Sequence, residues 1–430
     1  MMLTTHSRGW RRPAAVVLAA LALGVTAACG GDDEASGDTV TLHFTWWGNA
    51  DRADLTEQAI DMFEAEHPDI RIETSFAEFN AYWEKMATQI AGGSAPDILQ
   101  MDYRYVREYA ERNVLREFNV DGVDVDTSAM EPGLLKAGEI DGTAYAIPMS
   151  QNTQALLYDP AAWAAAGEQA PGEEWSWDDL EQGGAAVAAA GEVAALSDFG
   201  QIEDWFEVWL RQQGKELYTE DGELGYTTDD VAAYWTFTNG LREAGIVSPA
   251  EETATMDGSQ ANSPLAKQTS AAEFNYDSGL TADSWEIYGR ELALAPFPTD
   301  GGELGQYAKP SMLICISQRS EHPEEAAQFI DFLLNDIEVG ELLGTSRGMP
   351  ANAEVREAIG ADLEGPPLLA YEFEQALLPQ LADAPAPPPR GAGSVKAAFQ
   401  RIYDDVIFGS ATPEDAAARF IAEAEQALAQ

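Results

Sequence analysis

The stretch VTLHFTWW, residues 40–47, decides the fold, because it begins a series of strands and helices that alternate along the chain. Its side chains alternate toward a β-strand, and Gly48-Asn49 ends that strand. The apolar side chains from Leu55 to Phe63 then share one face at helical spacing, and Asp54 is placed to cap this helix. His67-Pro68 stops the helix, so the first unit is a strand followed by a helix.

The same order repeats after the first helix. Residues 70–76 predict a second alternating strand, residues 82–91 a second helix ended by Gly92-Gly93, and residues 97–101 a short third strand. Strands and helices that alternate at this spacing indicate parallel βαβ units, in which ligands bind at the carboxyl ends of the strands. The side chains expected at that crevice are Trp46, Trp47, Asn49, Glu78, Asp102 and Tyr103.

The remainder of the chain continues as a mixture of strands and helices. Strands are expected at residues 144–148, 154–158, 269–276, 292–296 and 311–317, with residues 149–153 joining the first two. Helices are expected between residues 160 and 244, over residues 323–334, and after residue 350, except in the rigid proline-rich segment at residues 384–389. The predicted fold class is therefore α/β.

The N-terminal run RGWRRPAAVVLAALALGVTAACGG, residues 8–31, is typical of an export signal. Basic residues precede an apolar segment that is too short to remain as a membrane-spanning helix, and small residues follow it. Residues 25–29, VTAAC, resemble a bacterial lipobox, in which Cys29 is acylated and becomes the new N-terminus. An ordinary secretory signal cut near Ala28 is the alternative, and both interpretations place the protein outside the cytoplasm.

We therefore predict a signal peptide at residues 1–28 and a flexible tether at residues 29–38, which are small, polar and acidic. The expected location is the extracellular face of the cytoplasmic membrane, with a lipid anchor on Cys29. The only other cysteine is Cys315, so no internal disulfide is expected. Cys315 lies in an apolar run and is expected to be a buried core side chain, with a nucleophilic role as the alternative.

The charge of the chain limits its partners. Acidic residues outnumber basic ones by 74 to 24, which gives a formal net charge of −50 at pH 7. This charge repels the phosphates of nucleic acid and argues against attachment to an anionic membrane surface by charge. A neutral ligand is the easiest to reconcile with this field and a cation comes next. The acidic balance and the scarcity of cations expected in the cleft make an anionic ligand the least expected.

An ordered series of short motifs runs along the chain from residue 44 to residue 350. The motifs are FTWWG at 44–48, F-x-x-x-H-P-x-I at 63–70, AGGSAPDI at 91–98, G-x-x-Y-x-I-P at 142–148, ALLYD at 155–159, WDDL at 177–180, KPS at 309–311, PEEAAQFI at 323–330 and RGMP at 347–350. Each motif alone is weak, but their order and spacing together are specific. The series resembles the extracellular carbohydrate-binding proteins of bacterial ABC importers, which are family 1 solute-binding lipoproteins similar to maltose-binding protein.

The resemblance implies a two-lobed periplasmic-binding-protein-like fold that closes on a ligand in a central cleft. By similarity, the three interlobe crossings lie near Ser150, Lys309 and Ser346. The expected lobes are residues 39–149 plus 311–345, and residues 150–310 plus 346–430. The family implies a monomer that captures a sugar, an oligosaccharide above all, and delivers it to permease subunits in the membrane. It implies no cofactor, no metal and no catalytic residue.

A sugar has apolar C–H faces and a rim of hydroxyl groups, so its site needs aromatic side chains and planar polar groups. Trp46 and Trp47 are adjacent on a strand, so one of them should point into the core, and we favour Trp47 as the side chain exposed to the cleft. The predicted ligand-binding residues are Trp46, Trp47, Asn49, Asp51, Glu78, Asp102, Tyr103, Gln151, Asn152, Glu203, Trp205, Asn275, Tyr276, Asp277, Ser311 and Arg347.

Several of these residues have a structural alternative. Asp102 could instead cap the next helix, and Gln151 and Asn152 could be satisfied amides of a hinge. Trp205 lies four residues before Trp209, so the two could share a packing face of one helix. Arg347 could fork onto two vicinal hydroxyls of a sugar or form an ion pair between lobes.

Other classes of function remain as alternatives. A binding protein for another polar solute, such as a glycerol phosphodiester, shares much of this outline. A secreted glycoside hydrolase would need two carboxylates that face one glycosidic bond, and among so many acids a chance pair carries no weight. The chain has no P-loop and no HExxH motif, so we predict that it is not an enzyme. An adhesive or scaffold lipoprotein is a further class, and it should show no closure on a ligand.

Overall fold

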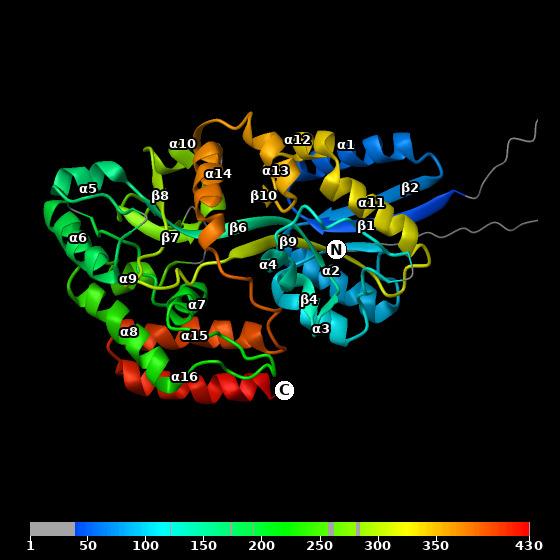
Figure 1. Ribbon diagram of the computed structural model, residues 1–430. Helices are drawn as coiled ribbons and strands as arrows, with labels where there is room; N and C mark the ends of the chain where they lie inside the picture. The colour runs from blue at the N-terminus through cyan, green and yellow to red at the C-terminus, as the bar shows by residue number, and fades with distance from the viewer. Residues whose placement is uncertain are drawn as a thin grey trace, which may run out of the picture. The chain divides into compact units, whose positions relative to one another are not determined.

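The alternation predicted from residue 40 onward is present in the computed structural model of this protein (Figure 1), which describes residues 39–120, 122–172, 174–191, 193–256, 262–280 and 284–429. The predicted signal peptide, Cys29 and the tether lie outside the described residues. None of the described helices is both long and apolar enough to span a bilayer.

The first βαβ units form as predicted. Strand β1 (Val40–Trp47) pairs in parallel with β2 (Ile70–Ala77) on one side and with β3 (Ile98–Met101) on the other. Helix α1 (Ala50–Glu66) connects β1 to β2, and α2 (Phe79–Gly92) connects β2 to β3.

Helix α1 begins earlier than predicted, at Ala50, and its cap is Asn49 and not Asp54. The Asn49 side chain accepts the backbone N–H of Arg52 at 3.0 Å, which satisfies one of the free donors of the first turn. Helix α2 begins at Phe79 and ends at Gly92, and its C-cap is Gly93, whose φ of 77° is the left-handed conformation that glycine adopts most easily.

The centre of the fold is one long strand, β6 (Ile147–Tyr158), where two separate segments were expected. Its first half pairs antiparallel with β9 (Ala308–Ile316), and its second half pairs with β7 (Ala272–Tyr276) and β8 (Ala293–Ala295). The short β10 (Met349–Pro350) pairs with its middle. Because β9 and β10 supply backbone partners here, β6 continues through residues 149–153, with register shifts against β9 between Pro148 and Gln151. The sheet order is β10-β6-β9-β3-β1-β2.

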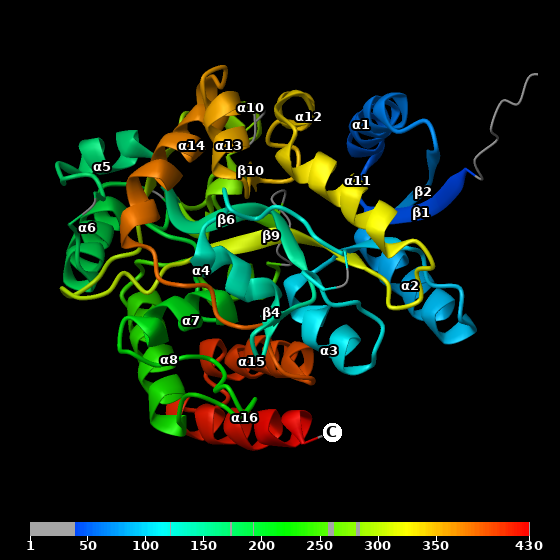
Figure 2. The ribbon, with the colours of Figure 1, turned by 45° about the vertical axis from the view of Figure 1, so that its right-hand side comes forward.

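The other elements surround this sheet (Figures 1 and 2). They are η1 (Tyr103–Tyr105), α3 (Val106–Glu111), α4 (Pro132–Leu135), η2 (Lys136–Gly138), β4 (Glu139–Ile140), β5 (Thr143–Ala144), α5 (Pro160–Ala166), α6 (Trp177–Ala190), α7 (Glu203–Arg211), α8 (Thr228–Glu243), α9 (Ala250–Thr253), η4 (Asp277–Gly279), α10 (Ser284–Tyr288), α11 (Pro323–Asn335), α12 (Ile337–Leu343), α13 (Ala353–Gly360), α14 (Gly365–Leu377), η5 (Leu378–Gln380), α15 (Ala392–Ile407) and α16 (Pro413–Leu428).

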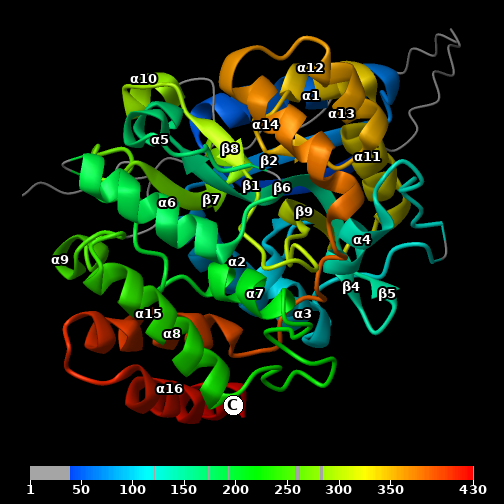
Figure 3. The same cartoon turned by 60° about the vertical axis from the view of Figure 1, so that its left-hand side comes forward.

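Separate hydrophobic cores make two lobes. One core gathers apolar side chains of β1 to β3, α1, α2, α11 and α12, and Ile147 of β6 belongs to it. A second gathers those of α5 to α8, β7, α15 and α16, together with Leu156 of β6, and a smaller core lies under α10 and α14. In Figure 3, α8, α15 and α16 lie together at the base of the second lobe.

The fold is therefore a two-lobed α/β fold, with crossings at β6, at β9 and at the segment that ends in β10. The exact lobe boundaries given above stay a prediction. Cys315 lies in β9 and is fully buried among the apolar side chains of the first core, where burial raises the pKa of its thiol well above the ordinary value.

Candidate functional site

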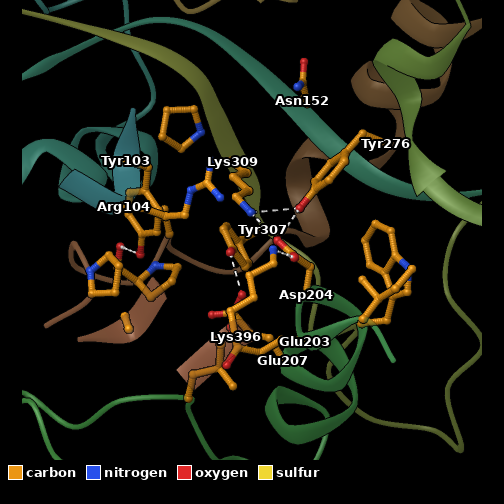
Figure 4. A pocket seen from close by; sticks show the side chains of 18 of the residues that line it. Tyr103, Arg104, Asn152, Glu203, Asp204, Glu207, Tyr276, Tyr307, Lys309 and Lys396 are labelled. Carbon is orange, nitrogen blue, oxygen red and sulfur yellow. Dashed lines mark hydrogen bonds and ion pairs between the residues drawn. The ribbon is translucent and has the colours of Figure 1, made fainter. Parts of the chain in front are cut away.

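A cavity of about 1560 Å³ opens between side chains of both lobes. Its walls come from the residues after β3, the start of β9, the end of β7, helices α7 and α15, and the proline-rich segment at residues 384–389 (Figure 4). This volume exceeds the roughly 300–1,000 Å³ of an ordinary small-molecule pocket, so the cavity has room for more than one sugar ring.

The centre of the cavity is the carboxylate of Asp204, in the first turn of α7. The ammonium groups of Lys309, from β9, and Lys396, from α15, both contact it. The hydroxyl of Tyr276, at the end of β7, donates to Asp204 Oδ1 at 3.0 Å. Burial acts to raise the pKa of Asp204, but the two ammonium groups outweigh it and hold that pKa well below its ordinary value.

Two further carboxyl groups of α7 lie beside Asp204. Burial raises the pKa of Glu203 to about 8, and Glu203 Oε1 has no hydrogen-bond partner among the described residues. Burial also raises the pKa of Glu207, whose Oε2 accepts the hydroxyl of Tyr307 at 2.8 Å. At neutral pH, Glu203 is therefore mostly a neutral acid that can both donate and accept a hydrogen bond.

The opposite wall follows β3. Asp102 is bound by Arg104 in a bidentate pair, with Nε–Oδ1 at 2.9 Å and Nη2–Oδ2 at 3.0 Å. Asp102 also accepts the backbone N–H of Arg104 and so caps η1, which is its structural alternative, yet it lines the cavity. The hydroxyl of Tyr103 donates to the carbonyl of Ala386 at 2.7 Å, and Arg107 Nε donates to that of Pro387 at 3.0 Å. These contacts hold the proline-rich segment against the first lobe.

Trp205 and Tyr276 supply an aromatic surface in the second lobe. Their ring centroids lie 5.3 Å apart, and Trp205 also packs against Phe297 at 5.5 Å. Trp209, four residues further along α7, packs instead against Phe206 and Tyr234 in the core. Both tryptophans pack in the second core, and Trp205 is the one that also lines the cavity.

Several lining residues carry buried polar atoms without a hydrogen-bond partner among the described residues. They are Asn152 Oδ1, Glu203 Oε1, Trp205 Nε1, Arg211 Nε and Tyr218 Oη. A buried polar atom without a partner costs roughly 1–3 kcal/mol, so such atoms are rare in cores and common where a ligand or water completes the bonding. The cavity therefore offers donors and acceptors to a polar ligand.

Half of the predicted ligand-binding residues line this cavity. They are Asp102, Tyr103, Asn152, Glu203, Trp205, Asn275, Tyr276 and Ser311. Asn275 donates to Glu273 Oε1 at 3.0 Å, and the hydroxyl of Ser311 contacts that of Ser150. The described lining does not include the other eight, which are Trp46, Trp47, Asn49, Asp51, Glu78, Gln151, Asp277 and Arg347.

The residues beside β1 and β2 are engaged in the first lobe. Trp46 is fully buried, and Trp47, favoured above as the exposed one, is only 8% exposed. Trp47 packs against Phe79 at 5.4 Å and Tyr82 at 5.5 Å, so both tryptophans belong to the core. The remaining three stand at helix starts: Asn49 caps α1, Asp51 is exposed in its first turn, and Glu78 is exposed before α2.

Two of the predicted residues near the first crossing, Gln151 and Asp277, form hydrogen bonds within the protein. Gln151 Nε2 donates to Glu374 Oε1 at 2.6 Å, and Asp277 Oδ1 accepts the backbone N–H of Thr153 at 3.0 Å. Burial and the nearness of Glu374 raise the pKa of Asp277 well above its ordinary value. Gln151 and Asp277 therefore join the strand crossing to η4 and α14.

Arg347 lies outside the described lining and forms none of the ion pairs of the described residues, so its contact with a ligand stays a prediction. It is buried and donates to the hydroxyl of Thr56 in α1, and no carboxylate of the described residues is in ion-pair distance. Burial and the nearby positive charge of Arg52 lower the pKa of Arg347 to about 9. Its contacts tie the third crossing to α1.

Sequence reasoning missed most of the basic residues of the cavity. The lining contains Arg104, Arg107, Lys136, Arg211, Lys309 and Lys396, which is a quarter of the chain's 24 lysines and arginines. The expectation that the cleft is poor in cations was therefore wrong. Lys309 stands in the KPS motif and was predicted only as a crossing, whereas no local signal distinguishes Lys396 within its helix.

One sequence pattern bears on enzyme activity. Residues 344–348, GTSRG, match the G-x-S-x-G pattern of serine hydrolases. A nucleophile elbow needs a strand before the serine and a helix after it, but here the stretch follows α12 and precedes β10. The hydroxyl of Ser346 faces Arg347 Nη1 at 3.5 Å, and none of its hydrogen bonds among the described residues involves a histidine.

Comparison with known proteins gives consistent matches. The family model for bacterial extracellular solute-binding proteins matches residues 58–370. The structure resembles an extracellular solute-binding protein family 1 member from Alicyclobacillus acidocaldarius, which is 34% identical, with a TM-score of 0.76 over 92% of this chain and 100% of that one. It also resembles an oligogalacturonide-binding protein from Yersinia enterocolitica, solved with digalacturonic acid, which is 21% identical, with a TM-score of 0.74 over 91% and 99% of the two chains. An uncharacterized lipoprotein of Streptomyces antibioticus is 23% identical over 69% of this chain and 67% of its own.

Proposed function

This chain belongs to the family of bacterial extracellular solute-binding proteins, and from that premise we propose that it is the substrate-binding lipoprotein of an ABC-type carbohydrate importer. In this role it captures a sugar or oligosaccharide between its lobes and delivers it to the permease subunits in the membrane. Acylation of Cys29 anchors it to the outer face of the cytoplasmic membrane. The relative from Streptomyces antibioticus, described as a lipoprotein, supports this anchor.

The observation that carries the proposal is the composition of the cavity. The aromatic pair of Trp205 and Tyr276 suits the apolar face of a sugar ring. The unpartnered atoms Asn152 Oδ1 and Glu203 Oε1 suit its hydroxyl groups. The oligogalacturonide bound by the Yersinia enterocolitica relative gives further support for a saccharide.

Closure of the two lobes on the ligand is expected because the cavity residues come from both lobes. Asp102 and Tyr103 belong to the first lobe, whereas Glu203 and Tyr276 belong to the second. A ligand that contacts both walls at once stabilises the closed form over the open form, since only the closed form makes both sets of contacts. The permease can then distinguish the loaded protein from the empty one. We propose that the protein acts as a monomer.

Ligand titration tests the proposal directly. Trp205 at the cavity wall should report binding as a change in intrinsic tryptophan fluorescence, and a bound ligand should raise the melting temperature. We expect a saturable response to a few related sugars and none to amino acids, peptides or polyamines, with the sugars recovered unchanged by chromatography. Turnover of the sugar would indicate a hydrolase, and a response only to a control compound would indicate another polar solute, such as a glycerol phosphodiester.

Detergent phase partitioning tests the anchor. The wild-type chain made in a bacterial host that acylates lipoproteins should enter the detergent phase, because an acyl chain contributes about 0.8 kcal/mol for each buried CH₂ group. The Cys29→Ser variant should remain in the aqueous phase. If both proteins partition alike into the aqueous phase, Cys29 is not acylated and the N-terminal segment is an ordinary secretory signal.

A further inference from the structure

Two positive side chains converge on one carboxylate at the centre of the cavity. Lys309 and Lys396 both contact Asp204, and the hydroxyl of Tyr276 lies 2.9 Å from Lys309 Nζ and 3.0 Å from Asp204 Oδ1. Figure 4 shows these groups converging at one point in the cavity. Each ammonium carries one positive charge and Asp204 carries one negative charge, so one positive charge has no counterpart in this cluster.

The nearest acids, Glu203 and Glu207, form no ion pair with either lysine among the described residues. Glu203 and Glu207 are each only 6% exposed, and burial disfavours the ionised form of both by raising their pKa values. On the opposite wall, Asp102 is neutralised by its bidentate pair with Arg104. Among the described residues, Asp204 is the one carboxylate in ion-pair distance of either lysine, so the direct contacts of the two lysines form a positive patch within a chain whose net charge is −50.

Arg107 adds a further cation to the opposite wall. Its ion-pair partner among the described residues is Glu111, 3.9 Å away and 45% exposed, so the pair is weak. Four of the remaining lining acids are engaged elsewhere: Glu216 and Asp383 pair with Arg211 and Lys136, and Asp198 and Glu273 accept hydrogen bonds from protein donors. The last three are Asp141 and Glu220, which are exposed, and Glu139, which is half-buried.

We propose that the cavity binds a saccharide that carries a carboxylate, such as a uronic-acid oligosaccharide, with this carboxylate seated on the ammonium groups of Lys309 and Lys396. The inference rests on the sugar-binding function proposed above and specifies its substrate class. The ligand carboxylate supplies the negative charge that the two lysines lack, through hydrogen bonds about twice as strong as those between neutral groups. A neutral sugar leaves the excess charge without a counter-ion, and an amino sugar adds a third positive charge.

Titration calorimetry with matched ligands tests this substrate class. Oligomers of galacturonate, glucuronate and mannuronate are compared with galactose, glucose and mannose oligomers of the same length. We expect at least one uronate series to bind about tenfold or more tightly than its neutral counterpart, since a charged hydrogen bond contributes more than a neutral one. The preference should shrink as salt is added, because ions screen the attraction.

Lys396→Met tests the seat of the carboxylate. It removes one ammonium but leaves Asp204 with Lys309 and Tyr276, so the fold should persist, and uronate affinity should fall about tenfold or more. Lys396→Gln replaces it if the methionine variant does not fold. Lys215→Met is the matched control, because Lys215 pairs with Asp230 outside the described lining and its loss should leave uronate affinity unchanged.

The results of these experiments distinguish a failure of the acidic substrate class from a failure of the proposed sugar-binding function. Neutral oligosaccharides that bind as tightly as the uronates would overturn the acidic substrate class and leave sugar binding intact. Unchanged uronate affinity in both Lys396→Met and Lys309→Met would overturn the lysine seat. If no saccharide binds at all, the proposed sugar-binding function is refuted, and this inference falls with it.

Discussion

Replacing Glu203 by glutamine should make the protein more stable, and increasingly so as the pH rises. Glu203 is 6% exposed, and its Oε1 has no hydrogen-bond partner among the described residues. A carboxylate in such a place is poorly solvated, so the ionised form is disfavoured in the folded state. Glutamine has almost the same shape and no ionised form, so the variant isolates the cost of this one charge.

The size and sign of the effect follow from the pKa. A glutamate ordinarily titrates at 4.5, whereas burial raises the pKa of Glu203 to about 8 in the folded protein. Between these values the folded state binds more protons than the unfolded state, so wild-type stability falls as the pH rises through this window. At about 1.4 kcal/mol for each pH unit, the loss amounts to about 5 kcal/mol above pH 8. The Glu203→Gln variant does not lose this stability, because glutamine does not titrate.

Urea denaturation of the wild-type and Glu203→Gln proteins from about pH 4 to about pH 9 measures this loss of stability. The free energy of unfolding of the variant, relative to wild type, should grow across this range by several kcal/mol, up to about 5 kcal/mol. Other titrating groups, including Asp204, are common to both proteins and largely cancel in the difference. A difference that changes by less than about 1 kcal/mol would show that Glu203 titrates like a solvated glutamate. It would also remove one support for the positive patch around the lysines.

Three further predictions concern single side chains. Trp47→Ala should lower the free energy of unfolding by about 3–5 kcal/mol, because Trp47 packs against Phe79. The folded variant should keep its sugar affinity in calorimetry. Weaker binding with intact stability would contradict this prediction. Tyr276→Phe keeps the ring but removes the hydroxyl bonded to Asp204, so sugar affinity should fall roughly three- to tenfold. Tyr276→Ala should lower the affinity further. If both variants lose the same affinity, the ring contributes nothing to binding. Cys315 is fully buried, so without the anchor cysteine the native protein should not react with Ellman's reagent until it is unfolded; rapid reaction would contradict its place in the core.

The elements that could be predicted are those with a strong local pattern. Residues 40–47 and 70–76 alternate in polarity and form β1 and β2, and Gly93 ends α2 as expected. Local pattern failed where a neighbour decides the outcome. Residues 149–153 looked like a connection, yet they continue β6 because β9 and β10 pair with them.

Only half of the residues predicted for the site line the cavity, since position at a strand end does not say which way a side chain faces. Trp47 follows a strand as predicted for a cleft residue, but Phe79 and Tyr82 of α2 pack over it and take it into the core. Asp102 stands at an equivalent strand end and does line the cavity, beside β9. The packing of α2 makes the difference, and that packing is not encoded in the few residues around each strand end.

The sequence by itself determined the α/β fold class and the family, because each of these rests on motifs and periodicities that short stretches carry. The export signal at the N-terminus stays a prediction from such a stretch. Only the tertiary structure decided the chemistry of the cavity. Asp204 lies 105 residues from Lys309 and 192 residues from Lys396, and the three meet only when α7, β9 and α15 are packed together. The chain has 74 acidic residues, and no local sequence feature predicts that two lysines contact the carboxylate of Asp204.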